Sequence, residues 1–340
     1  IVVGGNPTEE QNVLAVPAKK AIREGAKLVV IDSRETEFTR YATEWLRPKP
    51  GSEPLLIAAI SRVILDESLE DKTYVDSRLK NVTELKQSLW AFDLAKISRH
   101  TGIEESQIRR AARLFAESDA GAILVGNDGL DDTAATQVAD AVVNLAAITG
   151  NIGEDASGIF PLFNGANTLG ARDMGVRPKE DGLDVTKMIS GMRDTTIKAA
   201  LVMADGMSGY SEDLDGLTSA LEKLEFLAVS AVFDSEITAH ADVVLPAATY
   251  AEQTSTVTNL ERRVQLLRIT TESREEVQTG WETICLIANA MGGSGFDYSS
   301  SSDIFSEISG VFPNYANLSH DLLQSGGVQW PTTEEDNNGT

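Results

Sequence analysis

The sequence of 340 residues has one cysteine, three histidines and no long apolar run. A single cysteine, Cys285, excludes a disulfide within the chain and leaves no cysteine cluster for structural zinc or an iron–sulfur centre. His100 and His240 have no neighbours at ligand spacing, so we expect no metal site. Because no apolar run approaches the roughly 20 residues that span a bilayer, we also expect no membrane insertion. The chain begins at Ile1, inside an expected strand and without an initiator Met or signal peptide, which predicts a fragment of a longer, cytoplasmic protein.

Positive charge is scarce. The sequence has 29 Lys and Arg against 52 Asp and Glu, a formal net charge of −23. Nucleic acid and anionic membranes would be repelled by such a chain, so neither is expected as its main partner. The acidic residues are spread along the chain and arginine outnumbers lysine. This pattern suits a protein that works in concentrated salt, where repulsion is screened, or an ordinary acidic cytosolic protein.

Two apolar runs end in the same polar motif. Residues 28–31 are followed by Asp32-Ser33-x-x-Thr36, and residues 226–233 by Asp234-Ser235-x-x-Thr238. Apolar runs of this length read as buried strands, and the residues just beyond the carboxyl end of a parallel strand are where open α/β sheets bind ligands. A strand that ends in small residues precedes each copy. We therefore predict an internal duplication in which Asp32 pairs with Asp234.

The first strand leads into Gly4-Gly5-Asn6-Pro7, a turn that can bring backbone close to a ligand and start a helix. The order of strand, turn, helix, strand and acid is typical of dinucleotide binders, although the G-x-G-x-x-G fingerprint is missing. We predict an α/β fold with two pseudo-symmetric dinucleotide-binding-like domains and parallel sheets. The first domain covers 1–178, the second 179–292, and a linker or acidic tail 293–340, with a short helix around 304–308. The glycine- and amide-rich loop 158–178 has no periodicity and is expected to be functional.

A larger set of stretches shares one family pattern in unbroken order. It comprises Gly4 to Glu9, Ile31 to Thr36, Pro50 to Glu53, Leu145 to Gly153, Asn164 to Gly175, Ala241 to Glu252 and Thr258 to Gln265. Together these stretches, from about Ile1 to Gly292, resemble the molybdopterin oxidoreductases, and most of all the formate dehydrogenase large subunit. The resemblance implies two molybdopterin guanine dinucleotides with molybdenum or tungsten between them. It also implies formate as substrate, electron-transfer subunits as partners, and an iron–sulfur cluster and metal ligand upstream of Ile1.

The resemblance also assigns residues to the cofactor. Asn6, Asp32, Ser33, Arg34, Gly51 and Glu53 would hold one guanine nucleotide. The other pterin and nucleotide would contact Gly129, Gly165, Asn167, Asp205, Gly206, Ser208, Ser235 and Thr238. Carboxylates can pair with guanine N–H donors, and Arg34 can donate two hydrogen bonds to a phosphate. No residue of this chain is assigned to catalysis or to the metal.

The chain departs from the family pattern at two positions. Phe163 stands where formate dehydrogenases carry an arginine beside the metal, and Ala231 stands where the second nucleotide-facing aspartate is usual. These departures favour an alternative, a structural electron-transfer subunit like the large peripheral subunit of NADH:quinone oxidoreductase, with no active molybdenum site. An unrelated nicotinamide-binding α/β protein is a third hypothesis, but it requires a better glycine fingerprint than Gly4-Gly5-Asn6 and leaves the Gly165–Gly175 loop unexplained.

Overall fold

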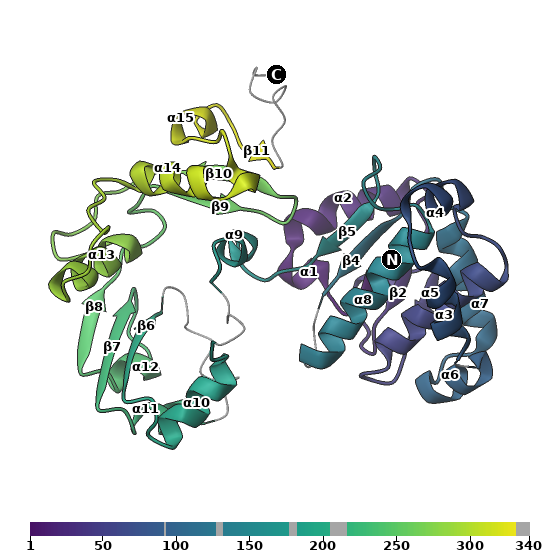
Figure 1. Ribbon diagram of the computed structural model, residues 1–340, viewed down its shortest axis with the longest axis horizontal. Coiled ribbons are helices and arrows are strands. Elements are labelled where there is room, and N and C mark those ends of the chain that lie inside the picture. The colour runs from purple at the N-terminus through teal and green to yellow at the C-terminus, as the bar shows by residue number, and fades with distance from the viewer. Residues whose placement is uncertain (92, 127–131, 177–181, 205–215, 331–340) are drawn as a thin grey trace. The chain divides into compact units, whose positions relative to one another are not determined.

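Short apolar strands alternate with helices to form two separate parallel sheets (Figure 1). The computed structural model describes residues 1–91, 93–126, 132–176, 182–204 and 216–330, without the side chains of residues 132 and 133. The chain divides into two compact units, Ile1–Asn164 and Gly165–Thr340. The predicted α/β class with parallel sheets is confirmed.

The first unit is built on a five-stranded parallel sheet of order β3-β2-β1-β4-β5. Its strands are β1 Val2–Val3, β2 Val29–Ile31, β3 Glu44–Leu46, β4 Ala122–Val125 and β5 Gly158–Pro161. Its helices are α1 Pro7–Glu10, α2 Asn12–Arg23, η1 Phe38–Tyr41, α3 Glu53–Asp66, α4 Lys72–Arg78, α5 Val82–Trp90, α6 Leu94–Thr101, α7 Glu105–Ala116 and α8 Asp132–Ile148. The chain leaves β1 toward β2 and β3 on one side and later places β4 and β5 on the other. The sheet order therefore reverses between β1 and β4.

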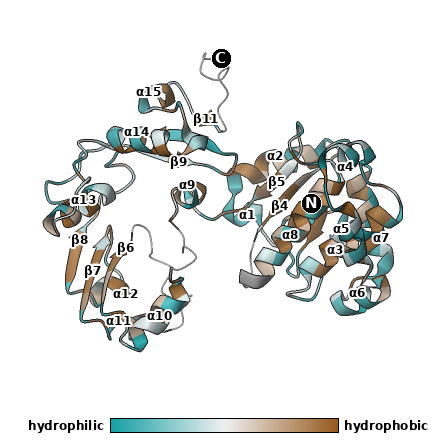
Figure 2. Cartoon of the chain, viewed as in Figure 1, coloured by the Kyte–Doolittle hydropathy of each residue, from teal (hydrophilic) through white to brown (hydrophobic). Residues whose placement is uncertain are grey.

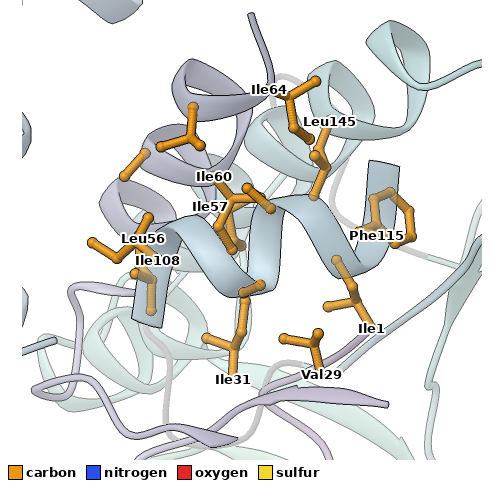
Figure 3. Close-up of a cluster of buried hydrophobic side chains, with 14 of the residues drawn as sticks. Ile1, Val29, Ile31, Leu56, Ile57, Ile60, Ile64, Ile108, Phe115 and Leu145 are labelled. Carbon is orange, nitrogen blue, oxygen red and sulfur yellow. The ribbon is translucent and has the colours of Figure 1, made fainter. Parts of the chain in front are cut away.

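Helix α3 is the centre of the first core. Leu56, Ile57, Ile60, Val63 and Ile64 have no exposed surface, because α3 packs on the strands and on α5, α6, α7 and α8. Figure 3 shows its isoleucines between the β2 side chains and those of α7 and α8. The apolar run of residues 55–65 lies within this helix, which spans Glu53–Asp66. Its start lies beyond the carboxyl end of β3, so Glu53 is placed at the ligand-binding edge of the sheet.

The second unit holds a three-stranded parallel sheet and a three-stranded antiparallel one. The parallel sheet, of order β6-β7-β8, consists of β6 Ala199–Met203, β7 Phe226–Ala231 and β8 Val243–Pro246, and the antiparallel sheet, of order β11-β10-β9, consists of β9 Ser255–Thr258, β10 Arg263–Leu267 and β11 Val328–Gln329. The helices are α9 Thr168–Asp173, α10 Val185–Arg193, α11 Leu217–Leu221, α12 Glu236–Ala239, α13 Gly280–Ala290, α14 Ser301–Val311, η2 Pro313–Tyr315 and α15 His320–Leu323. Most strands of the two parallel sheets are hydrophobic (Figure 2). Strand β2 is buried along its whole length, as expected for a strand covered by helices.

The boundary between the units differs from the predicted 178/179. It falls between Asn164 and Gly165 because α9, part of the expected functional loop, belongs to the second unit. The backbone N–H of Thr258 in β9 donates to Asn167 Oδ1 over 2.8 Å, which ties the residue before α9 to the antiparallel sheet.

Residues 301–330 differ from the linker or tail that the sequence suggested for 293–340. Helix α14 contains the expected 304–308 segment, and Phe305, Tyr315, Leu318 and Leu323 form a buried cluster with Val264 of β10. The Ser- and Asp-rich composition suggested a tail, but segment 301–330 also has an apolar face, which packs against the antiparallel sheet. Residues 331–340 lie outside the described part of the chain.

The two parallel sheets repeat one backbone arrangement. Leu28 donates its backbone N–H to Thr43 Oγ1 over 3.1 Å and accepts from the Thr43 N–H over 2.7 Å. Leu227 likewise donates to Asp242 Oδ2 over 2.8 Å and accepts from the Asp242 N–H over 2.9 Å. Each reciprocal pair joins the start of the middle strand to the residue before the next strand. Leu28 therefore corresponds to Leu227, and Thr43 to Asp242.

This register corrects the predicted pairing of Asp32 with Asp234. Counted from Leu28 and Leu227, Asp32 corresponds to Ala231, and the two Asp-Ser-x-x-Thr motifs are three residues out of register. Strand pairing agrees, because Ile31 lies opposite Leu46 and Ser230 lies opposite Leu245. The shared Asp-Ser-x-x-Thr motif therefore does not mark equivalent positions. The backbone hydrogen bonds show which residues of the two units are equivalent.

Glu67, just after α3, stabilises the first unit through α7. It accepts hydrogen bonds from Arg113 Nε over 2.6 Å and from Arg109 Nη1 over 3.0 Å. These bonds, that from Arg113 foremost, lower the pKa of the Glu67 carboxyl. A folded-state pKa below the unfolded one adds stability above the ordinary value of 4.5, and that stability is lost as the pH falls through the folded pKa.

Glu67→Gln is therefore expected to lower the Tm by roughly 2 °C at neutral pH, because both arginines remain partly exposed and screened. The difference from the unmodified chain should shrink and vanish in acid. Thermal melts at several pH values measure it. Glu24→Gln, which removes a fully exposed pair with Lys20, is the control and should change little at any pH. An equal loss in acid and at neutral pH would contradict the assignment.

Candidate functional site

The carboxyl ends of β1 and β4 approach each other unusually closely. A methyl group on Gly126 would lie 2.1 Å from the Gly4 carbonyl oxygen and 2.7 Å from Gly5 Cα. Gly4 has a φ of +52°, in the left-handed region. These glycines lie at the point where the strand order reverses, and open α/β sheets bind ligands at such points. The turn Gly4-Gly5 predicted from sequence therefore packs directly against Gly126 after β4, with no room for a side chain on Gly126.

Asn6 and Gln11 shape the chain after this turn. Asn6 is 3% exposed and its Oδ1 accepts from Thr8 Oγ1 over 2.7 Å. Gln11, between α1 and α2, is buried and donates to Asn164 Oδ1 over 3.1 Å. Its other amide atom, Oε1, is buried and makes no hydrogen bond among the described residues. Sequence reasoning missed Gln11, since a lone glutamine in a helical pattern carries no signal.

Asp32, directly after β2, is buried at 5% exposure, and its Oδ1 accepts from the Arg34 N–H over 2.7 Å. The side chains of β3 support it from the next strand. Trp45 Nε1 donates to the Asp32 carbonyl over 3.0 Å, and Arg47 Nε donates to the Ser33 carbonyl over 3.0 Å. Arg34 itself is exposed. Asp32, Ser33 and Arg34 thus lie at the carboxyl end of β2, and their assignment to a nucleotide stays a prediction.

Arg47 is a cation at this edge that sequence reasoning missed. It stacks over the Trp45 ring, with Cζ 5.4 Å from the ring centroid. Arg47 directly follows β3, two residues after Trp45, and side chains alternate in extended backbone, so the two lie on the same side. That alternation was the available signal. An exposed guanidinium beside Ser33 adds a second group, after Arg34, that could contact a phosphate.

Two buried oxygens near this edge lack hydrogen bonds. Glu53, the first residue of α3, is 5% exposed and its Oε2 has no partner among the described residues. Thr36 is 6% exposed and its Oγ1 is likewise unpaired there. Buried polar atoms are nearly always hydrogen-bonded, so such atoms call for an explanation. Gly51, in the preceding turn, has a φ of +82° that favours glycine. Acceptors of this kind fit a ligand that donates N–H bonds, as guanine does.

The predicted site residues of the second unit are engaged in local structure. Asn167 Oδ1 accepts from Thr258, and Gly165 has a φ of +84°. Ser235 and Thr238 form a capping box at α12: the Thr238 N–H donates to Ser235 Oγ over 3.3 Å and the Ser235 N–H to Thr238 Oγ1 over 2.8 Å. The predicted site residues outside the described part of the chain are Gly129, Asp205, Gly206 and Ser208.

The corrected repeat register makes the two halves unequal. Ala231 stands at the position of Asp32, and Phe233, 71% exposed, stands at that of Arg34. Ser235 and Thr238 correspond to Thr36 and Thr39 instead of to Ser33 and Thr36. The first unit therefore has charged and hydrogen-bonding groups at a strand end where the second has apolar ones.

The described residues hold no group of three or more His, Cys, Asp or Glu side chains able to bind a metal ion. Phe163, at the position of the family's near-metal arginine, is partly buried beside Leu162 after β5. Within the described ranges, no helix is both long and apolar enough to span a lipid bilayer.

Comparison with known proteins supports the resemblance. The family model for molybdopterin oxidoreductases matches residues 1–290. The chain is 31% identical to the F420-dependent formate dehydrogenase subunit alpha of Methanocaldococcus jannaschii, a match that covers 100% of this chain and 54% of that protein. It is 30% identical to the assimilatory nitrate reductase catalytic subunit of Bacillus subtilis, covering 100% and 53%. The chain thus spans about half the length of the curated relatives it matches.

A solved structure shares the fold. Acetylene hydratase from Pelobacter acetylenicus matches with a TM-score of 0.75 at 18% identity, over 97% of this chain and 51% of that one. Because the family model covers most of the chain and the parallel sheets have the expected arrangement, this chain belongs to the molybdopterin oxidoreductase family.

Proposed function

We propose that this chain is the central, cofactor-binding part of an enzyme that oxidises formate to carbon dioxide, releasing one proton and two electrons. Family membership implies a molybdopterin cofactor with molybdenum or tungsten. The proposal specifies two molybdopterin guanine dinucleotides, an iron–sulfur cluster in a further domain, electron-transfer subunits as partners, and a cytoplasmic location. Formate is favoured because several of the most similar relatives are named formate dehydrogenases.

The edge of the first sheet carries this proposal. Asp32 and Glu53 are buried carboxyl groups, and Glu53 Oε2 and Thr36 Oγ1 make no hydrogen bond among the described residues. Guanine presents a ring N–H and an exocyclic amine, which match such acceptors. The turn Gly4-Gly5 lies where the strand order reverses, and a pyrophosphate would bind beside this turn in the proposal. These residues fit the nucleotide end of the cofactor.

The proposed work of this chain is binding and orientation. Bound metal and dithiolenes would supply the two-electron chemistry. Asp32, Glu53 and Thr36 would select the guanine, while Arg34 and Arg47 would neutralise phosphate charge. Holding the nucleotide at a buried edge would fix the reactive end of the cofactor at a constant position, so that substrate meets it in one geometry.

A second candidate is the structural electron-transfer subunit without an active molybdenum site. Phe163 favours it, because a small carboxylate substrate is best held by an arginine, and this chain has none at that position. The replacement of nucleotide-facing groups by Ala231 and Phe233 in the second unit points the same way. Nitrate reduction is a third outcome, since a nitrate reductase catalytic subunit is among the relatives.

Metal analysis and assays of the full-length protein separate these candidates. We expect stoichiometric molybdenum or tungsten, guanine released on acid hydrolysis of the cofactor, and formate-dependent reduction of a viologen dye. Metal with nitrate-dependent oxidation of the reduced dye, and no response to formate, would replace formate by nitrate. Protein without metal or pterin would reject the enzyme and favour the structural subunit.

A further inference from the structure

A buried network of polar side chains connects helix α9 to the segment 301–330 within the second unit. Tyr315 is 3% exposed, and its hydroxyl donates to Asp173 Oδ2 over 2.8 Å. The same hydroxyl oxygen lies 3.0 Å from Thr258 Oγ1. Since a phenol carries one proton, which goes to Asp173, the Thr258 hydroxyl acts as donor to Tyr315. Burial raises the pKa of Tyr315 to about 12, so this proton stays in place at neutral pH.

The network holds α9 at both ends. Asn167 precedes the helix and its Oδ1 accepts from the Thr258 backbone N–H over 2.8 Å, while Asp173 is the last residue of the helix. Thr258 therefore contacts the first end directly and the second through Tyr315. Between the ends, a methyl group on Gly170 would lie 2.2 Å from Asn167 Oδ1 and 3.2 Å from Thr258 Oγ1. Helix α9 thus packs against β9 without room for a side chain.

Tyr315 is itself firmly placed. Its carbonyl accepts from Ser309 Oγ of α14 over 3.0 Å, and its N–H donates to the Phe312 carbonyl over 2.9 Å. Its ring lies 6.4 Å from that of Trp330, in the cluster that includes Phe305. Segment 301–330 is therefore folded, and it supports α9 through Tyr315. Capping of the six-residue helix α9 does not by itself require a hydrogen bond between its last residue, Asp173, and the buried Tyr315.

Residues 165–173 include Gly165 and Asn167, which the family resemblance assigns to a pterin. Asn167 Oδ1 already accepts a hydrogen bond from the Thr258 N–H, so this side chain helps to fix the conformation of the loop. We propose that Tyr315 is a positioning residue, which holds residues 165–173 in the conformation that retains the cofactor. This inference rests on the proposed function. It adds segment 301–330, for which we propose no contact with the cofactor, to the parts of the chain that retain the cofactor.

Tyr315→Phe in the full-length protein tests the inference. The ring is kept, but Asp173 Oδ2 and Thr258 Oγ1 each lose a partner. We expect hydrogen exchange of the Ala171 amide in α9 and of the Met174 amide just after it to accelerate roughly ten-fold, since buried hydrogen bonds to charged groups are among the stronger ones. The rate of cofactor release, followed by the fluorescence of the oxidised pterin, should rise by a similar factor. Asp173→Asn keeps an acceptor and should restore most of the protection relative to Asp173→Ala.

Tyr298→Phe is the matched control, because Tyr298 also donates to a carboxyl group, Glu307, but on an exposed surface. It should change neither readout. Unchanged exchange in Tyr315→Phe would overturn the inference, as would faster exchange without faster cofactor release. An unmodified protein that holds no pterin would overturn the proposed function and the cofactor part of the inference, whereas the exchange data would still show whether Tyr315 holds α9.

Discussion

Replacing Glu53 with methionine is expected to weaken guanine nucleotide binding by roughly two orders of magnitude or more, while leaving the first unit as stable as before or more so. Methionine has nearly the length of glutamate and no atom that requires a hydrogen bond. Removing a buried, unpaired carboxyl oxygen is neutral or stabilising when the replacement is apolar and of similar shape. A purely structural Glu53 would show the opposite, a loss of stability.

The binding loss should be large because the carboxyl group would accept two bonds from guanine. Each hydrogen bond to a charged group contributes about 1.5–3 kcal/mol, and each 1.4 kcal/mol is tenfold in affinity. Even at the lower limit, GDP binding by the cofactor-free chain should weaken by roughly a hundredfold. Calorimetric titration with GDP measures the affinity, and thermal melts measure the stability.

Glu105→Gln is the matched control. Glu105 also lies in the first turn of a helix, α7, in the same unit, so its replacement tests the general effect of removing a charge near a helix start. GDP affinity should be unchanged in this variant. If Glu53→Met binds GDP as the unmodified chain does, the nucleotide is not held at this edge of the sheet.

Gly126→Ala is expected to be the most damaging single methyl in the first unit. The added carbon would overlap the Gly4 carbonyl oxygen and Gly5 Cα, and both are backbone atoms that cannot rotate away. Overpacking of this kind costs typically about 1–3 kcal/mol, and a backbone obstacle places it at the upper end. We expect the Tm to fall by roughly 6–12 °C, with loss of GDP binding because β1 and β4 must separate.

Gly5→Ala is the informative comparison, since its methyl would mainly meet Leu162 Cδ1, the flexible end of a side chain. Its Tm should fall by about half as much or less. Circular dichroism melts of both variants provide the test. Equal Tm losses, or none in Gly126→Ala, would show that the close approach of the two strand ends is not a requirement of the fold.

The unequal strand ends of the two units suggest a division of roles for the cofactor. Asp32 and Arg34 have no charged counterpart at the equivalent positions Ala231 and Phe233. If both units hold a nucleotide, the first should bind GDP more tightly. The family resemblance had already marked Ala231 as a departure in the second copy, although the sequence motif paired Asp32 with Asp234.

Several features followed from the sequence without the structure. Apolar runs ending in polar turns predicted β2 and β7, since burial on both faces demands such runs. Strand β5, Gly158–Pro161, was not predicted, because it lies in the stretch 158–178 that was expected to be a loop. The start of α3 near Glu53 followed from its turn residues. The family resemblance followed from the order of short motifs. These features depend on neighbouring residues or on a fixed spacing along the chain, so they can be recognised in the sequence.

Other features depend on contacts between distant residues. Nothing near Asp234 in the sequence reveals that it is out of register with Asp32; the pairing of Leu227 with Asp242 decides that. Burial of Glu53 Oε2 and the approach of Gly126 to Gly4 arise only when strands distant in sequence become neighbours. Tyr315 lies 142 positions from Asp173, in a segment whose serine-rich composition suggested a tail. Sequence determined the elements and the family, and tertiary packing decided which buried polar groups meet.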